Sequence, residues 1–387
     1  MTKHSRINDI QPFHVMALLA RAKELEASGK NIVHMEIGEP DFPTPKPIVD
    51  AGIKAISQGD VYYTPAVGLP ELRQAIAEFY QSRYNVSVSA NRVVVTPGAS
   101  GALMLTLGVV MQEGDEVLLA DPGYPCNRNF VRFLSGETRS VSVDATSGYQ
   151  LTLKHLQENW QANTAAAIVA SPSNPTGTLL SKSELVAMAE FVKEQGGYLI
   201  VDEIYHGLVY DVEYDTALAV DNNIIVINSF SKYFNMTGWR LGWVVAPEKL
   251  IGDMDKLAQN IFLAAPTPAQ HAALAAFTPE TISILESHKE EFKQRRDYLL
   301  PALKELGFKI EIEPQGAFYI YANCEKFTND SYQFAYDLLE NIGVAITPGK
   351  DFGDNKHNSH VRFAYTTSIE KLKEGVSRLR DYLLNMQ

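Results

Sequence analysis

Residues 229–242 read Ser-Phe-Ser-Lys-Tyr-Phe-Asn-Met-Thr-Gly-Trp-Arg-Leu-Gly and begin where an apolar run at 224–228 ends. Open α/β sheets bind their ligands at such strand ends. Two serine hydroxyls and the guanidinium of Arg240 suit a phosphate group, and Lys232 suits a Schiff base with an aldehyde. A single lysine is more often a solvated surface residue, but these neighbours favour a ligand site.

Working outward, seven short runs rich in valine and isoleucine are typical of strands buried between helices. They span residues 92–96, 116–120, 138–143, 166–170, 198–201, 224–228 and 241–245. Helical patterns occupy 100–112 and 181–195, and the second opens with a Ser-x-x-Glu capping box at Ser181 and Glu184. We therefore predict an α/β fold with a mostly parallel seven-stranded sheet between helices.

The two ends of the chain follow a different pattern. Residues 13–29 and 285–306 predict two helices, the second long and charged. Further strand-like and helical pieces follow at 309–313, 317–321, 331–341, 360–364 and 369–385. Because 387 residues are too many for one simple core, we predict a large domain of residues 46–280. A smaller α+β domain would combine the N-terminal arm, 1–45, with residues 281–387.

Composition argues against several classes of function. The formal charge of -12 disfavours nucleic-acid binding, which needs a basic face. Cys126 and Cys324 are too far apart in sequence to form a disulfide framework or a cysteine-rich metal site, and the histidines lack metal-ligand spacing. No apolar run has the length of a membrane span or a signal core. We expect a cytoplasmic protein with no metal, no membrane and no nucleic-acid partner.

Two loops next to predicted strands contain residues suited to ligand binding. Thr-Pro-Gly-Ala-Ser-Gly at 96–101 joins a strand to a helix, where small residues let backbone N–H groups approach an anion. Ser-Pro-Ser-Asn174-Pro175-Thr-Gly follows another strand, and its Asn-Pro bond could be cis and direct the asparagine toward a ligand. Each also has a plain structural explanation, a helix cap and a tight turn.

Charged residues at two other strands suggest ion pairing. Asp202 ends an apolar run and Tyr205 follows three residues later, which suits a carboxylate facing a cationic ligand atom. Arg362 lies among apolar residues at 360–364, where a buried guanidinium needs a partner such as a substrate carboxylate. The plain alternatives are a turn-capping aspartate and a structural salt bridge.

Taken in order, these segments resemble the class I/II aminotransferases of the aspartate aminotransferase-like superfamily, fold-type I enzymes that use pyridoxal 5'-phosphate (PLP). The resemblance covers nearly the whole chain, from Gly-Glu-Pro-Asp-Phe-Pro-Thr-Pro at 38–45 through Tyr63-Thr-Pro-x-x-Gly68 to His360-Val-Arg362. It implies an enzyme that moves the amino group of an L-amino acid to a 2-oxo acid. The implied mechanism is a ping-pong aldimine/ketimine sequence on PLP.

The resemblance implies roles for the residues around the cofactor ring. Lys232 would form the internal aldimine with PLP and then act as general base. Asp202 would pair with the pyridine nitrogen, and Tyr205 and Asn174 would hydrogen-bond the ring's phenolic oxygen. Tyr124 would stack on the ring. Lys232, Asp202 and Tyr205 are thus the expected catalytic residues.

It also implies how the phosphate and the substrate are held. The expected phosphate-binding residues are Gly98, Ala99, Ser100, Ser229, Ser231 and Arg240. Tyr63 would reach the phosphate of a neighbouring subunit, so the active unit would be a homodimer with shared active sites. Arg362 would grip the substrate carboxylate, helped by Gly38 and Asn174. Gly101 departs from the family pattern, in which a polar residue is common, and this bears on specificity.

Other functions fit many of the same residues. A PLP-dependent C–S β-lyase would use the same lysine and phosphate site, and it would release pyruvate and ammonia without a 2-oxo acid. A ligand-sensing regulator would need an attached DNA-binding module, and we expect no room for one because the pattern begins within the first 40 residues. For the aminotransferase, we expect a broad or neutral donor range, with pyruvate or 2-oxoglutarate as acceptor. Candidate lining residues are Phe13, Tyr62, Asn127 and Arg128.

Overall fold

The fold centres on a seven-stranded sheet with the order β2-β8-β7-β6-β5-β3-β4 in a computed structural model that describes residues 6–10 and 12–386. Its strands are β2 (Val93–Thr96), β3 (Glu116–Asp121), β4 (Glu137–Ser142), β5 (Thr164–Ala170), β6 (Tyr198–Asp202), β7 (Ile225–Ser229) and β8 (Gly242–Val245). β8 runs antiparallel to both neighbours, and the other pairs are parallel. The predicted mostly parallel α/β sheet is confirmed.

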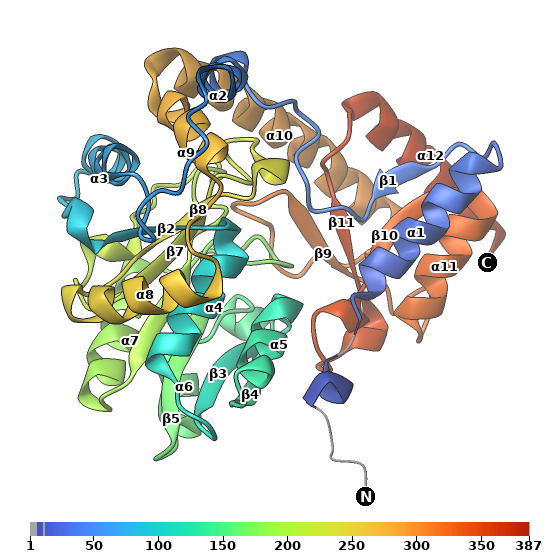
Figure 1. Cartoon of the computed structure of the whole chain (residues 1–387). Coiled ribbons are helices and arrows are strands. Elements are labelled where there is room, and N and C mark those ends of the chain that lie inside the picture. The colour runs from blue at the N-terminus through green and yellow to red at the C-terminus, as the bar shows by residue number, and fades with distance from the viewer. Residues whose placement is uncertain (1–5, 11, 387) are drawn as a thin grey trace, which may run out of the picture.

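Helices cover both faces of this sheet, as Figure 1 shows. They are α3 (Pro70–Tyr84), α4 (Gly98–Val110), α5 (Pro125–Phe133), α6 (Leu153–Asn159), α7 (Lys182–Glu194), α8 (Glu248–Ile261) and α9 (Thr267–Leu274). α2 (Lys46–Gln58) packs on the outside of α9. Successive residues of β2 alternate between two apolar clusters, because Val93 and Val95 pack into one and Val94 into the other. This two-sided burial explains why the strands read as continuous apolar runs.

A smaller sheet has the order β1-β10-β11-β9 and lies to the right in Figure 1. Its strands are β1 (Val33–Met35), β9 (Tyr319–Asn323), β10 (Val344–Pro348) and β11 (His360–Ala364). The helices of this part are α1 (His14–Ala27), α10 (Pro279–Leu306), α11 (Ser331–Ile342) and α12 (Ile369–Asn385). β1 pairs in parallel with β10, so a strand from near the N-terminus completes a sheet built from the last third of the chain. The first five residues of the predicted N-terminal arm lie outside the described residues.

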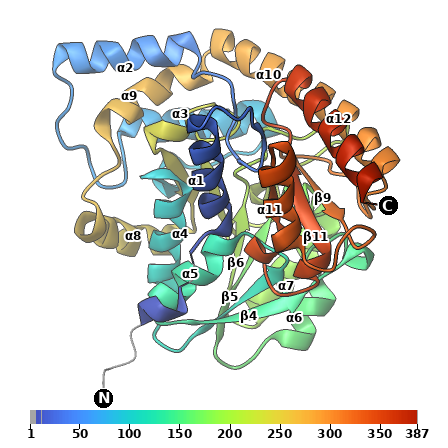
Figure 2. The same ribbon diagram turned by 90° about the vertical axis from the view of Figure 1, so that its right-hand side faces the viewer.

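Short 3-10 helices occupy Arg6–Asp9, Ala90–Arg92, Ala145–Ser147, Ala217–Ala219, Thr237–Trp239, Ala275–Phe277, Gly349–Asp351 and His357–Ser359. Figure 2 shows α1 on the side of the molecule where α4, α5 and α11 also lie. Within the described ranges, no helix combines the length and the apolar character needed to cross a membrane.

Two local expectations are corrected. The Ser181 hydroxyl accepts a hydrogen bond from the Glu184 backbone as predicted, but the Glu184 carboxylate accepts one from the Leu153 backbone N–H, which ties α7 to α6 instead of closing the capping box. The prediction of a strand at 309–313 is wrong. In this segment Lys309 forms only an isolated bridge with Asn323, and no strand continues from it. The left-handed Ala317, with φ of 58°, turns the chain before β9 begins.

Candidate active site

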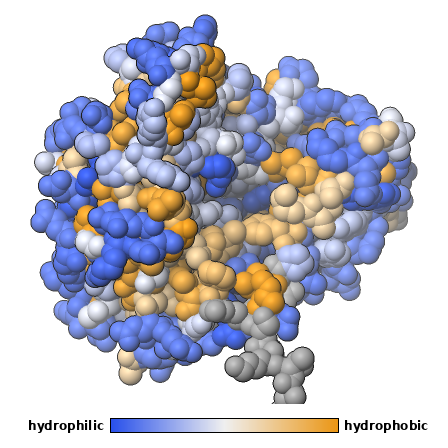
Figure 3. Space-filling model, viewed as in Figure 1, coloured by the Kyte–Doolittle hydropathy of each residue, from blue (hydrophilic) through white to orange (hydrophobic). Residues whose placement is uncertain are grey.

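A cavity of about 250 Å³ lies between the two sheets, where β6 and β7 end. Its walls come from the loops after these strands, from the start of α4, from α1 and from the small sheet. Figure 3 shows a hollow between the two parts of the molecule, with apolar side chains along its sides. The cavity lies at the carboxyl ends of parallel strands, where the sequence predicted a ligand site.

Lys232 reaches into this cavity from the loop after β7. Its Nζ donates a hydrogen bond to the carbonyl oxygen of Gly38 at 2.6 Å and lies 5.9 Å from the ring centres of Tyr205 and Phe318. Burial lowers the pKa of Lys232 to about 8, although the charge of Glu39 acts to raise it. A lysine in this state supplies an appreciable fraction of neutral amine near neutral pH, as a nucleophile or base requires.

Asp202 ends β6 and is 5% exposed. Its Oδ1 accepts a hydrogen bond from the backbone N–H of Ile204 at 3.0 Å. Burial raises the pKa of Asp202 to about 6, against the opposing effects of that hydrogen bond and of the Lys232 charge. A carboxylate held this way gains from a cationic partner in the cavity, because the partner offsets the cost of burying the negative charge.

A cluster of anion-binding groups surrounds the start of α4. Gly98 has a φ of 71°, and a Cβ added to it would lie 2.7 Å from Nη2 of Arg240, so glycine allows the guanidinium to approach the helix N-terminus. The hydroxyl of Ser229 donates to that of Ser231 at 2.9 Å. No acidic side chain in the described part of the chain forms a salt bridge with Arg240; its Nη1 donates to the Thr237 carbonyl at 3.1 Å. Hydroxyls, a guanidinium and a helix N-terminus together fit a phosphate.

Arg362 faces the cavity from β11. Its Nη1 donates to Oδ1 of Asn174 at 2.9 Å, and its Nη2 donates to the carbonyl oxygen of Glu36 at 2.6 Å and to the Thr347 hydroxyl at 3.1 Å. Thr347 lies directly opposite Arg362 in the antiparallel pair of β10 and β11, which explains this contact. The Nε atom of Arg362 is buried with no partner among the described residues. A guanidinium with donors to spare fits a carboxylate.

Most of the predicted site residues meet at this cavity. They are Gly38, Ala99, Ser100, Tyr124, Asn174, Asp202, Tyr205, Ser229, Ser231, Lys232, Arg240 and Arg362. Gly98 is not itself in the lining but precedes the lining residue Ala99 at the start of α4, and the Asn174–Pro175 bond is cis. Tyr63 is not brought to the cavity of its own chain, and its side chain is 84% exposed. Gly101 packs against Pro97, where an added Cβ would approach the ring within 3.0 Å.

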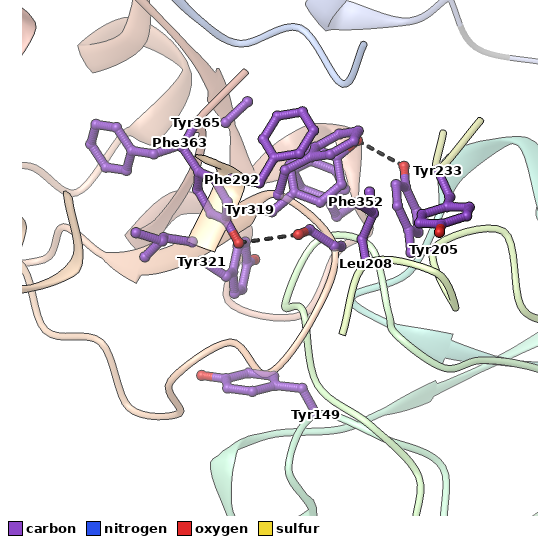
Figure 4. Close-up of a cluster of buried hydrophobic side chains, with 14 of the residues drawn as sticks. Tyr149, Tyr205, Leu208, Tyr233, Phe292, Tyr319, Tyr321, Phe352, Phe363 and Tyr365 are labelled. Atoms are coloured by element: carbon purple, nitrogen blue, oxygen red, sulfur yellow. Dashed lines mark hydrogen bonds between the residues drawn. The ribbon is translucent and has the colours of Figure 1, made fainter. Parts of the chain in front are cut away.

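Sequence reasoning missed Tyr319, which lies beside Tyr205 and shares a hydrogen bond of 2.8 Å with it (Figure 4). The ring of Tyr319 also lies 4.1 Å from the Arg362 guanidinium. A Cβ at Gly38 would clash with the Tyr319 hydroxyl, so this position requires glycine. Without the fold, the only signal for Tyr319 is an aromatic residue in a strand, which core packing explains equally well.

The other candidate lining residues divide into three groups. Phe13 lines the cavity, whereas Tyr62 is 80% exposed and does not. Asn127 and Arg128 line a recess of about 40 Å³ that adjoins the cavity at Tyr124. Among the described residues, no group of three or more histidine, cysteine, aspartate or glutamate side chains is arranged to hold a metal ion.

Known proteins resemble this chain along its whole length. The sequence model of a family described as aminotransferase class I and II matches residues 30–379. A (5-formylfuran-3-yl)methyl phosphate transaminase of Methanocaldococcus jannaschii is 41% identical over 98% of both chains. A valine–pyruvate aminotransferase of Mycobacterium tuberculosis is 37% identical over 97% of both chains. The crystal structure of an aminotransferase from Mycobacterium tuberculosis superimposes over all of both chains with a TM-score of 0.96 at 35% identity.

Proposed function

The chain belongs to the class I and II aminotransferase family, and from that premise we propose that it moves the amino group of L-amino acids to 2-oxo acids with PLP as its cofactor, attached at Lys232. Aminotransferase activity and the fold-type I architecture follow from the family. The observation that carries the cofactor assignment is the buried amine of Lys232, which opens into the same cavity as Asp202, Arg240 and Arg362.

The residues around the cavity fit PLP in charge and in chemistry. Ala99, Ser100, Ser229, Ser231 and Arg240 would hold its phosphate, because Arg240 forms no salt bridge within the described ranges and faces the start of α4. Asp202 would hold the ring nitrogen, Tyr205 and Asn174 the phenolic oxygen, and Tyr124 the face of the ring. When bound, PLP supplies an aldehyde that takes up the amino group and a ring that draws electrons from the substrate's Cα.

In the proposed reaction, the protein residues orient the substrate and move a proton. Arg362 holds the substrate carboxylate, which fixes one end of the substrate relative to Lys232. Nζ of Lys232 takes the proton from Cα as general base, and a pKa near 8 suits this task at neutral pH. The negative charge of Asp202 favours the protonated ring nitrogen throughout. We thus assign catalysis to Lys232, Asp202 and Tyr205, and substrate binding to Arg362, Asn174 and Gly38.

We further propose a cytoplasmic homodimer in which Tyr63 of one subunit reaches the phosphate in the other. The exposure of Tyr63 leaves its hydroxyl free for a neighbouring chain. Each subunit would have a large cofactor domain of residues 46–280. The second domain would comprise residues 1–45 and 281–387, in keeping with the pairing of β1 with β10.

The test is a single-turnover titration of the PLP-loaded enzyme with L-amino acids, in which the visible absorbance of the bound cofactor is followed. We expect the absorbance to convert to that of the amine form, with release of one 2-oxo acid per active site. Lys232→Ala should fold, bind PLP without the wild-type absorbance and lose turnover. Near-normal transamination by this variant would refute the assignment of Lys232. Release of ammonia and pyruvate without a 2-oxo acid would identify a lyase instead.

A further inference from the structure

We propose that this enzyme uses monocarboxylic substrates with apolar side chains in both half-reactions, and that it discriminates against dicarboxylic amino acids and 2-oxo acids. The inference rests on the proposed function, because it names the substrate class of the same cavity. The names of the two relatives specify chemically different substrates, so the substrate class must be inferred from the cavity of this chain. Two features carry the inference: an apolar wall formed by α1, and a cavity lining in which the described residues of one subunit leave no spare cation.

The apolar wall comes from the first turns of α1. Phe13, Val15, Met16 and Leu19 line the cavity, and Ile37 continues the wall after β1. α1 packs on β10, the strand that pairs with β11 at Arg362. The spacing of residues 15, 16 and 19 places them on one face of the helix. A substrate held at its carboxylate by Arg362 can extend its side chain along this face. Each buried methylene then stabilises the bound substrate by roughly 0.8 kcal/mol, or about fourfold in affinity.

The helix that forms this wall is fixed over the cavity by Asp351. The two oxygens of the Asp351 carboxylate accept hydrogen bonds from the backbone N–H groups of His14 and Val15, both at 2.8 Å. A carboxylate at this place satisfies two of the free donors at the helix start and interacts favourably with the helix dipole. The wall is therefore part of the folded structure and is present before a substrate arrives.

In the described part of one subunit, the cavity has no cation left for a second carboxylate. Among the described residues, its positively charged lining consists of Lys232, Arg240 and Arg362, and the proposed reaction assigns these to the amino group, the phosphate and the first carboxylate. The remaining charged lining residues are acidic. One of them is Glu36, whose Oε1 contacts Nδ1 of His34 at 2.7 Å and whose Oε2 is buried without a partner. A second substrate carboxylate would be buried near like charges, which is strongly unfavourable.

A further arginine, Arg128, lies next to the cavity but is engaged elsewhere. It lines the adjoining recess of about 40 Å³, and its Nη2 donates to the backbone carbonyl of Asp351 at 3.1 Å. The same recess contains the buried Oδ1 of Asn127, which has no partner among the described residues. A small polar recess of this kind suits a few water molecules better than a substrate side chain.

The preference for monocarboxylic substrates with apolar side chains applies to the amino acceptor as well. The amino group leaves one acid and enters the other at the same lysine, so both acids occupy the same cavity and meet the same α1 wall. We therefore expect pyruvate and longer monocarboxylic 2-oxo acids to be better acceptors than 2-oxoglutarate or oxaloacetate. This narrows the sequence-based expectation, which allowed either pyruvate or 2-oxoglutarate.

The test uses three donors with side chains of nearly the same shape, L-leucine, L-asparagine and L-aspartate, in single-turnover conversion of the PLP-loaded enzyme. We expect kcat/KM to fall in that order, with leucine preferred over aspartate by at least about 100-fold. The corresponding 2-oxo acids, 4-methyl-2-oxopentanoate and oxaloacetate, should show the same preference in the reverse half-reaction. Aspartate equal to or better than leucine would overturn the substrate class and leave the proposed function intact. Conversion by none of the L-amino acids, these three included, would overturn the proposed function itself.

A charge introduced into the wall tests the structural cause. Met16 is 58% exposed and lines the cavity, so Met16→Lys should fold and place an ammonium beside the substrate side chain. We expect the leucine-to-aspartate ratio to fall at least about tenfold. The matched control is Met386→Lys, at an exposed methionine outside the cavity lining, which should keep the wild-type ratio. An unchanged leucine-to-aspartate ratio in Met16→Lys would refute the role of α1 in selecting the substrate by its side chain.

Discussion

Nη1 of Arg362 donates a hydrogen bond to Oδ1 of Asn174 at 2.9 Å and so joins β11 of the small sheet to the loop after β5 of the large sheet. Arg362 is proposed to hold the substrate carboxylate, and Asn174 is proposed to hold the phenolic oxygen of the cofactor. The hydrogen bond therefore couples the orientation of the two molecules that must react. It also means that a change at either residue alters the position of the other.

Replacement of Arg362 by lysine should impair carboxylate substrates selectively. Lysine retains the charge but cannot keep the bonds to Asn174, Glu36 and Thr347 while holding a carboxylate in two-point contact. We expect kcat/KM for L-leucine to fall by about 100-fold in Arg362→Lys, mainly through KM, and to fall further in Arg362→Ala. Steady-state kinetics should be compared with those of 3-methylbutylamine, the amine that lacks only the carboxylate. An equal loss for both compounds would indicate a structural arginine. Arg139→Ala, at a partly exposed position of β4 outside the cavity lining, is the control.

Replacement of Gly38 by alanine should damage the site through Tyr319. The added methyl group would clash with the Tyr319 hydroxyl, which bonds to Tyr205, and would disturb the carbonyl oxygen that accepts from Lys232. We expect kcat to fall at least about tenfold, because small displacements of positioned groups are costly. Gly38→Ala combined with Tyr319→Phe removes the clashing oxygen and should recover several-fold of the loss.

The kcat of the double variant shows whether Gly38→Ala loses activity through a clash with Tyr319 or through a change in the backbone at position 38. A clash predicts that the two substitutions are strongly non-additive, as a double-mutant cycle would measure. Additive losses would mean that Gly38 acts through its backbone and not through Tyr319. Gly252→Ala is a suitable control, because an added Cβ at this helical position meets nothing within 4 Å.

The sequence predicted the large sheet well because its strands, apart from the edge strand β4, are buried on both faces. A run such as 164–170 has no polar face, so its apolar character alone marks it as a strand. The site residues could be predicted for a related reason. Asp202 is the last residue of one such strand, Lys232 lies in the loop just after another, and parallel strands end at a common edge.

Contacts between the two sheets could not be predicted in the same way. The meeting of Tyr319 with Tyr205 depends on how β9 is positioned against the loop after β6, and no local pattern encodes that placement. The α1 wall is a similar case, because an amphipathic helix shows which face is apolar but not what that face covers. β1, with three residues, is too short for periodicity to reveal it.

Glu203 should make the stability of the protein depend on pH. It is 1% exposed, accepts hydrogen bonds from the Thr216 hydroxyl and the Ala217 backbone N–H, and has a pKa that burial raises to about 8. Because this folded-state pKa exceeds the ordinary value of 4.5, its contribution is fully present below pH 4.5 and is lost as pH rises toward 8. Glu203→Gln should remove this loss, on the order of a few kcal/mol in the free energy of unfolding.

The measurement is denaturant unfolding of wild type and Glu203→Gln at pH 5, 6.5 and 8. The free-energy difference between them should grow in favour of the variant as pH rises. The pKa of the neighbouring His206, which burial lowers to about 3, makes stability rise with pH up to its ordinary value of 6.5. Wild type and variant share this contribution, so it cancels in their difference. Glu213→Gln, at an exposed position nearby, is the control. Parallel pH profiles for wild type and Glu203→Gln would contradict the prediction.

Tyr63 allows a direct test of the proposed shared active site. If its hydroxyl bonds the phosphate in the neighbouring subunit, Tyr63→Phe should weaken PLP binding by about tenfold, the size expected for one charge-assisted hydrogen bond. Because Tyr63 is 84% exposed in the single chain, the substitution should leave the fold intact. Equilibrium dialysis of PLP at fixed subunit concentration measures the effect, and Tyr62→Phe, at a neighbouring tyrosine with 80% exposure, is the control.

Mixed dimers separate a contact across the interface from one within a chain. A dimer of one Lys232→Ala subunit and one Tyr63→Ala subunit contains one site with both defects and one site with neither, if Tyr63 acts in the partner. Two differently tagged subunits, refolded together and purified through both tags, should then recover about half of the wild-type activity per dimer. If Tyr63 serves its own chain, each site carries one defect, and the activity stays near the level of the Tyr63→Ala site alone. Recovery of the wild-type site therefore requires that the tyrosine and the lysine come from different subunits.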